Sequence, residues 1–275
     1  MPPLRPSSLT EALEILARPM LVQITAGGPP PRPQPHALLM DTGRINEMSG
    51  IHRRGGVIVV GMNTSWEKLQ KSSLLHPGAA ALVTAAALME DEQPGGVLLQ
   101  ALDSTGHDSL ILLAMAALDA QIEIAALGPS GRISRLLLPW QQALQSLLAQ
   151  PYLPINFRFS LPLRAVGSAL HAESNLSPLQ PDARAAAALI SLNPDSGHIL
   201  GVRLALAVPH RLPVLCPAVT GIVGMDPGPE SIARAVELAR SCQQMHEIDY
   251  FLALSPHLLR ETLDLALARA TGSVY

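Results

Sequence analysis

The sequence predicts an α+β protein, and three features indicate this fold class. Near the N-terminus, Ser8 precedes Glu11 by three residues, which is the capping-box pattern at the start of a helix. Short apolar or β-branched runs such as 57–60 alternate with stretches of helical period along the chain. Turn-forming residues at 128–131 lie between two segments of strand character, and those at 193–197 form a hairpin turn into a strand that begins at 199. The pattern favours small antiparallel sheets backed by helices.

The first lobe is expected to span residues 1–62. Its predicted elements are a helix at 9–17, strands at 21–24 and 37–40, a short helical stretch near Ile45 and a strand at 57–60. The pair Gly27-Gly28 and the prolines that follow it, up to Pro35, place a long turn between the first two strands.

A second lobe is expected at 63–162 and a third at 163–275. Elements of the second lobe are helices within 66–88, where Pro77 fits a first helical position, a helix at 110–118, antiparallel strands from 122 and at 133–138, a helix at 139–148 and a strand at 155–161. Elements of the third lobe are a helix at 185–190, strands at 199–208 and 218–224, and helices at 229–242 and 256–270.

Composition excludes several classes of protein. Hydrophobic residues make up 48% of the 275 residues and charged residues 15%, which is the content of a folded chain. The formal net charge is -3, so no basic surplus exists for nucleic acid, and aromatic residues amount to only 3%. No run approaches the roughly 20 apolar residues of a membrane-spanning helix, and the N-terminus lacks the apolar segment of a secretory signal. We therefore expect a cytoplasmic protein with no membrane partner.

The sequence offers no catalytic or metal centre. Cys216 and Cys242 are the only cysteines, too few for an iron–sulfur cluster, and we expect two buried thiols. Ser104, His107 and Asp108 are neighbours in sequence, whereas the members of a catalytic triad normally come from separate elements. The pairs His171 with Glu173 and His246 with Asp249 each lack a third and fourth metal ligand nearby.

Six segments in a fixed order resemble one family. They are RPSSLTEALEILA, ITAGG, VIVVGMNTSWEKL, PGG, DSTGHD and VRLALAV. Together they are similar to the flavin-carrying medium subunit of carbon monoxide dehydrogenase and to the flavin domain of xanthine dehydrogenase, both of the molybdenum hydroxylase family. The resemblance covers nearly the whole chain. It implies the two-lobed FAD-binding fold of this subunit type, followed by a C-terminal α/β domain with a small antiparallel sheet.

The resemblance also implies the cofactor contacts. The first Gly-Gly loop would hold the FAD pyrophosphate through backbone N–H groups, a second Gly-Gly loop and an acidic residue after it would also contact the cofactor, and a polar turn would lie near the flavin. The residues that match are Ala26, Gly27, Gly28, Thr64, Gly95, Gly96 and Asp108, with Asp103 as the alternative acid. For Thr64 the competing interpretation is structural, since either Asn63 or Thr64 would suit the N-cap of the next helix.

Two departures from the family pattern reduce the number of hydrogen bonds expected to the FAD pyrophosphate. Pro29, Pro30 and Pro31 follow the first loop directly, and proline has no N–H to donate. Each lost charge-assisted hydrogen bond costs about 1.5 to 3 kcal/mol unless another group replaces it. Arg32 is the candidate replacement, because guanidinium pairs well with phosphate oxygens. In the second loop, Val97 stands where the family has asparagine.

Two functions follow as hypotheses. The first is an FAD-binding subunit that passes electrons from the iron–sulfur clusters of a partner to an acceptor, with a molybdopterin partner subunit carrying out the chemistry on the substrate. The second is a flavin-free paralogue that keeps the fold and acts as a scaffold or assembly protein. The proline run and Val97 favour the second.

Overall fold

The computed structural model describes residues 2–26, 36–76, 78–92, 97–103, 110–149, 151–161, 165–172, 184–207, 212–245 and 254–273. The α-helices of this described part are α1 (Leu9–Leu16), α2 (Trp66–Lys71), α3 (Ala80–Glu92), α4 (Gln100–Asp103), α5 (Leu110–Ala117), α6 (Trp140–Ala149), α7 (Pro229–Met245) and α8 (Pro256–Ala270). Short 3₁₀ helices occur at η1 (Asn46–Met48), η2 (Ser73–Leu75) and η3 (Pro217–Ile222). None of the described helices is long and apolar enough to cross a lipid bilayer.

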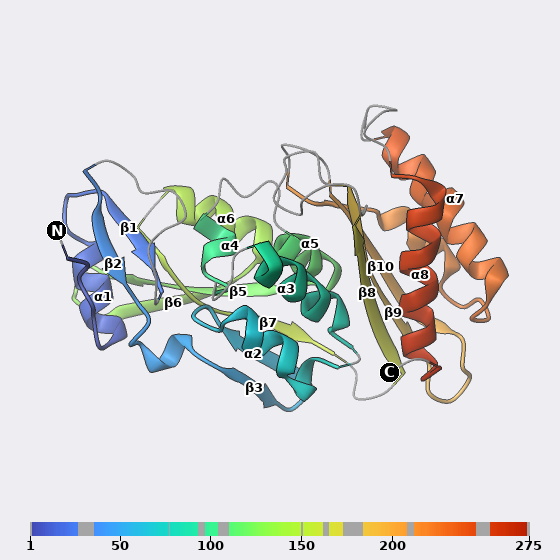
Figure 1. Cartoon of the computed structure of the whole chain (residues 1–275), viewed down its shortest axis with the longest axis horizontal. Coiled ribbons are helices and arrows are strands. Elements are labelled where there is room, and N and C mark those ends of the chain that lie inside the picture. The colour runs from blue at the N-terminus through green and yellow to red at the C-terminus, as the bar shows by residue number, and fades with distance from the viewer. Residues whose placement is uncertain are drawn as a thin grey trace.

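The described strands form three sheets, seen side by side in Figure 1. A parallel pair consists of β1 (Val22–Thr25) and β2 (Leu38–Asp41). An antiparallel five-stranded sheet has the order β3-β4-β7-β5-β6, with strands at Ile51–Arg54, Val57–Gly61, Leu153–Ser160, Gln121–Leu127 and Ile133–Pro139. An antiparallel four-stranded sheet has the order β11-β10-β9-β8, with strands at Val214–Leu215, Ile199–Leu206, Ala185–Leu192 and Val166–Ala172.

The predicted helix start is confirmed with Ser8 as its N-cap, but the return contact of Glu11 goes to Ser7, one residue before the cap. The Ser8 hydroxyl accepts a hydrogen bond from the Glu11 N–H, and the Glu11 carboxylate accepts one from the Ser7 N–H at 2.7 Å. The Ser8 contact satisfies the Glu11 N–H, one of the groups that the first turn of a helix leaves without an intrahelical partner, whereas the Glu11 carboxylate ties down the residue before the cap. The apolar face of α1 then packs into the main core.

The five-stranded sheet has one apolar face and one polar face. Side chains on alternate positions, such as Ile58, Ile122 and Phe157, are completely buried on the helix side, where α6 packs on β5 and β6. The opposite positions carry polar residues, among them Glu123 and Asn156. Successive side chains of a strand point to opposite faces, so apolar and polar positions alternate, but Glu123 and Asn156 are buried as well.

The four-stranded sheet is covered by helices on both faces. Helix α8 packs on β8 and β9, whereas α3 contacts β8 and α5 contacts β9 and β10 (Figure 1). Alternate alanines of β9 therefore enter two different cores: Ala185 and Ala187 join the core that contains α5, and Ala186 and Ala188 join the core that contains α8. Small side chains on both faces let the helical layers approach the strand closely.

The predicted helix at 185–190 is wrong, because this segment forms the first part of β9. Alanine has the highest intrinsic helix propensity, but propensity is a weak prior that burial between two layers overrides. The predicted strand at 218–224 is also wrong, because η3 occupies Pro217–Ile222. A 3₁₀ helix repeats every three residues, which turns Val219 and Ile222 to the same buried side.

Candidate functional site

Only two of the predicted cofactor residues lie in the described part of the chain. Ala26 and Thr64 are described, whereas the others, Gly27, Gly28, Arg32, Gly95, Gly96 and Asp108, lie outside the described residues. The same holds for Pro29–Pro31. The described part of the candidate site consists of the segments that flank the two glycine loops.

The first loop starts at the end of β1. Ala26 is buried, with 5% of its surface exposed, and the preceding residue, Thr25, pairs with Asp41 of the parallel strand β2. The Thr25 carbonyl accepts two hydrogen bonds from Thr42, one from its N–H at 2.7 Å and one from its hydroxyl at 2.9 Å. Thr42 therefore fixes the point at which the first glycine loop leaves the sheet.

The polar turn that follows β4 is largely buried, with Asn63 and Ser65 partly exposed. Thr64 is fully buried, its N–H donates to the Gly61 carbonyl at 3.0 Å, and its hydroxyl donates to the Gly50 carbonyl at 3.2 Å. The competing interpretation, that Asn63 or Thr64 caps the next helix, is wrong. The N-cap of α2 is Ser65, whose hydroxyl accepts from the Lys68 N–H. The cofactor contact of Thr64 stays a prediction.

The segment that leaves the second loop is bound to the same turn. Val97 pairs with Ser65 in an isolated antiparallel bridge. The Leu98 N–H donates to the Thr64 carbonyl at 3.0 Å, and the Leu99 N–H donates to the Met62 carbonyl at 2.7 Å. The second glycine loop therefore returns to the end of β4.

Asn63 joins this turn to the root of the first loop. Its side-chain amide donates to the Thr42 carbonyl at 2.7 Å, and its side-chain oxygen lies 3.1 Å from the Thr42 hydroxyl. The structure thus brings together three segments that are far apart in sequence, around residues 25, 63 and 98. Sequence reasoning missed Thr42, which belongs to none of the motifs that carry the resemblance and follows β2 as a single hydroxyl residue.

Five N–H groups beside the loops, all in the turn after β4 or in the segment after the second loop, are used inside the protein. The Asn63 N–H donates to the Met48 carbonyl, and the Val97 N–H donates to the side-chain oxygen of Gln100 at 3.1 Å, in addition to the donors of Thr64, Leu98 and Leu99 given above. The three segments around residues 25, 63 and 98 are thus bonded to one another, and we call them the frame. A diphosphate would have to be held by the glycine N–H groups and Arg32, all outside the described residues.

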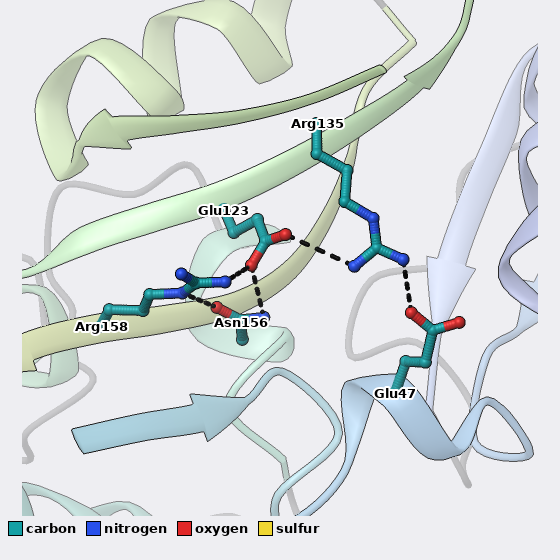
Figure 2. A network of polar contacts seen from close by, with 5 residues as sticks. All are labelled: Glu47, Glu123, Arg135, Asn156 and Arg158. Carbon is teal, nitrogen blue, oxygen red and sulfur yellow. Dashed lines mark hydrogen bonds and ion pairs between the residues drawn. The ribbon is translucent and has the colours of Figure 1, made fainter. Parts of the chain in front are cut away.

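A charged network lies on the polar face of the five-stranded sheet, next to this frame (Figure 2). The Glu123 carboxylate accepts from Asn156 at 2.9 Å, from Arg158, and from Arg135 at 3.4 Å, and Arg135 also reaches Glu47 of η1 at 2.5 Å. Burial raises the pKa of Glu123, but the Asn156 amide and the two guanidinium groups outweigh it, so that the net pKa lies below the ordinary 4.5.

The network is close to the frame because Asn156 lies opposite Gly61, the last residue of β4. At Gly61 the backbone of η1 comes so near that an added Cβ would lie 2.3 Å from the Met48 carbonyl oxygen. The 3₁₀ helix η1 is thus pressed onto the polar face of the sheet and held there by the ion pair between Glu47 and Arg135.

The two cysteines are buried, as expected. Burial, together with a hydrogen bond to the Cys242 thiol, raises the pKa of the Cys216 thiol far above its ordinary value. A thiol of this kind carries little thiolate and is a poor nucleophile. Among the residues that the structure describes, no group of three or more His, Cys, Asp or Glu could hold a metal ion. Glu173, His246 and Asp249, considered above as ligands, lie outside them.

The three sheets define an α+β fold of the type found in the medium subunit of carbon monoxide dehydrogenase, and the predicted fold class is confirmed. Carbon monoxide dehydrogenase from Oligotropha carboxidovorans superposes with a TM-score of 0.74 and 18% identity over 98% of this chain and 100% of that chain. The enzyme from Hydrogenophaga pseudoflava gives 0.74 and 20% identity over 98% of both chains. Quinoline 2-oxidoreductase from Pseudomonas putida 86 gives 0.71 and 18% identity over 100% of this chain and 99% of that chain.

The sequence comparisons give no relative. No protein-family model matches the sequence, and no curated protein matches it. The likeness to the molybdenum hydroxylases is thus one of fold along the whole chain, as the order of the motifs predicted.

Proposed function

We propose that this chain is the FAD-binding subunit of a molybdenum hydroxylase-type oxidoreductase. The observation that carries the proposal is the frame around residues 25, 63 and 98, which joins the roots of both glycine loops on a fold shared over the whole chain. A flavin bound there would supply electron transfer between one-electron and two-electron carriers. The groups that would contact it are Ala26, Gly27, Gly28, Arg32, Thr64, Gly95, Gly96 and Asp108.

The proposal includes partner subunits. The chain has two cysteines, both in the last lobe and both buried, so iron–sulfur clusters and a molybdopterin site would belong to other chains of a hetero-oligomer. We further propose a cytoplasmic location and three lobes, with boundaries after residues 62 and 162. Electrons would enter from the partner's clusters and leave through the flavin to an acceptor.

One observation favours a second function, that of a flavin-free scaffold or assembly protein. Pro29–Pro31 offer no N–H after the first loop, and the N–H groups of Val97, Leu98 and Leu99 after the second loop are all used inside the protein. If the glycines and Arg32 do not compensate, the fold persists without the cofactor.

Visible absorbance of the purified protein, followed by titration with FAD, separates the two functions. Equimolar flavin, as isolated or after titration, supports the first. A colourless protein that takes up no added FAD contradicts it. Replacement of Pro29, Pro30 and Pro31 by alanine restores three N–H groups, and replacement by glycine restores the same groups with added flexibility. If the wild type binds FAD weakly or not at all, and both triple variants gain FAD affinity to a similar extent, the missing N–H donors are the cause.

A further inference from the structure

We infer that Thr42 and Asn63 are positioning residues that couple the two glycine loops, an inference that rests on the proposed cofactor site. Thr42 is completely buried directly after β2, and Asn63 is partly buried directly after Met62. The Asn63 amide donates to the Thr42 carbonyl at 2.7 Å. The Thr42 hydroxyl shares its single proton between the Thr25 carbonyl at 2.9 Å and the Asn63 side-chain oxygen at 3.1 Å.

The coupling follows from what each partner holds on its other side. Thr42 holds the Thr25 carbonyl, one residue before Ala26 and the first glycine pair. Asn63 lies between Met62 and Thr64, whose carbonyls accept the N–H groups of Leu99 and Leu98 after the second glycine pair. A displacement of either loop root is therefore transmitted through two side chains to the other.

Burial makes these contacts sensitive to substitution. Without the Asn63 amide, the Thr42 carbonyl loses a donor in a place with no exposed surface on Thr42. A buried polar group that loses its partner bears the full cost of desolvation, so the surrounding backbone shifts to recover a partner. Thr42 and Asn63 themselves are not members of the hydrophobic core, so we expect the shift to change the relative position of the two loops without unfolding the chain.

The test uses Asn63→Leu and Thr42→Val, with Asn63→Asp as a second variant that keeps the acceptor and loses the donor. Thr42→Ser keeps the hydroxyl and should restore wild-type behaviour. The matched control is Thr262→Val, because Thr262 is also completely buried and its hydroxyl also donates to a backbone carbonyl, that of Leu258 at 2.7 Å. That bond lies within α8, far from both loops in sequence.

Amide hydrogen exchange is the first measurement, since it needs no flavin. We expect exchange at Leu98 and Leu99 to become about tenfold faster in the Asn63 and Thr42→Val variants, given the cost of a lost buried hydrogen bond. Thr262→Val and Thr42→Ser should leave these two amides unchanged. The inference is overturned if Asn63→Leu and Asn63→Asp accelerate exchange only at Thr42 and neighbouring residues while Leu98 and Leu99 keep wild-type protection.

The FAD dissociation constant is the second measurement. It is made by fluorescence titration at a temperature at which the wild type and all variants are folded. Coupled loops predict that Thr42→Val weakens FAD binding about tenfold, that Thr42→Ser does not, and that the control does not. Equal affinities of wild type and Thr42→Val would overturn the positioning role. If the wild type binds no FAD, the proposed function fails, and the exchange experiment still decides whether the loops are coupled.

Discussion

Replacement of Gly61 by alanine tests whether the close approach of η1 to the sheet supports the candidate site. In the structure an added Cβ lies 2.3 Å from the Met48 carbonyl oxygen and 2.4 Å from the Met48 carbonyl carbon. Ordinary contact begins at 3.4 Å, so two backbone segments would have to separate by 3.4 − 2.3 = 1.1 Å. Met48 and Ile45 are buried in the core and resist this movement. We expect a loss of about 3 kcal/mol in the free energy of unfolding.

The assay is urea unfolding followed by circular dichroism, with a thermal melt beside it. For a chain of this size, about 3 kcal/mol corresponds to a drop of roughly 6 to 12 °C in Tm. Gly56→Ala is the matched control, because Gly56 lies in the turn directly before the same strand and its added Cβ would come no closer than 3.9 Å to the Leu161 carbonyl oxygen. A Gly61→Ala variant as stable as Gly56→Ala would refute the argument that η1 is pressed against β4.

Three further predictions concern the network and the interface between layers. The pKa of Glu123 is lowered, so its carboxylate contributes stability that is present above pH 4.5 and is lost as the pH falls below it. Glu123→Gln should therefore cost about 2 kcal/mol in the free energy of unfolding at neutral pH. It should also flatten the acid side of a curve of stability against pH. Ser168→Ala should cost about 1 to 3 kcal/mol in urea unfolding, since the buried Ser168 hydroxyl accepts the Ala81 N–H at 3.0 Å; an unchanged exchange rate at the Ala81 amide would contradict this role. Ala187→Leu should lower Tm through an overpacking cost of about 1 to 3 kcal/mol, whereas a neutral result would mean that β9 and the helices can separate freely.

Elements with local signals could be predicted well. The last helix was expected at 256–270, and α8 has the same bounds, because Pro256 suits its first turn and Ser255 caps it. The turn at 193–197 joins β9 to β10 as expected, and the Asn193 side chain accepts the N–H groups of Asp195 and Ser196. In these segments capping and turn chemistry decide the structure, and both are written in adjacent residues.

Elements decided by distant contacts could not be predicted. The alanines of β9 favour a helix in isolation, and only the layers on both faces make a strand of them. Strand β3 was missed because its residues, His52, Arg53 and Arg54 among them, lack the β-branched enrichment of a strand and gain their pairing from β4.

The candidate site shows the same division. Motif order predicted two glycine loops, whose glycines lie outside the described residues, and a turn at Thr64, but the sequence did not show that Asn63 bonds to Thr42, which lies 21 residues earlier. That contact exists because β2 and β4 end side by side at the frame, and the positions of strand ends depend on the folded sheet. The helix cap likewise moved to Ser65, since Asn63 and Thr64 were engaged by other segments.

The burial of α5 has a consequence for how the chain can be divided. All eight of its residues, Leu110–Ala117, are shielded from water, because the helix packs against α3 and α4 and against strands β9 and β10. A fragment that stopped before residue 165 would leave part of this wholly apolar helix bare. We expect such a fragment to self-associate on expression. Residues 165–275 would therefore be needed to keep α5 shielded from water, whatever ligand the protein carries.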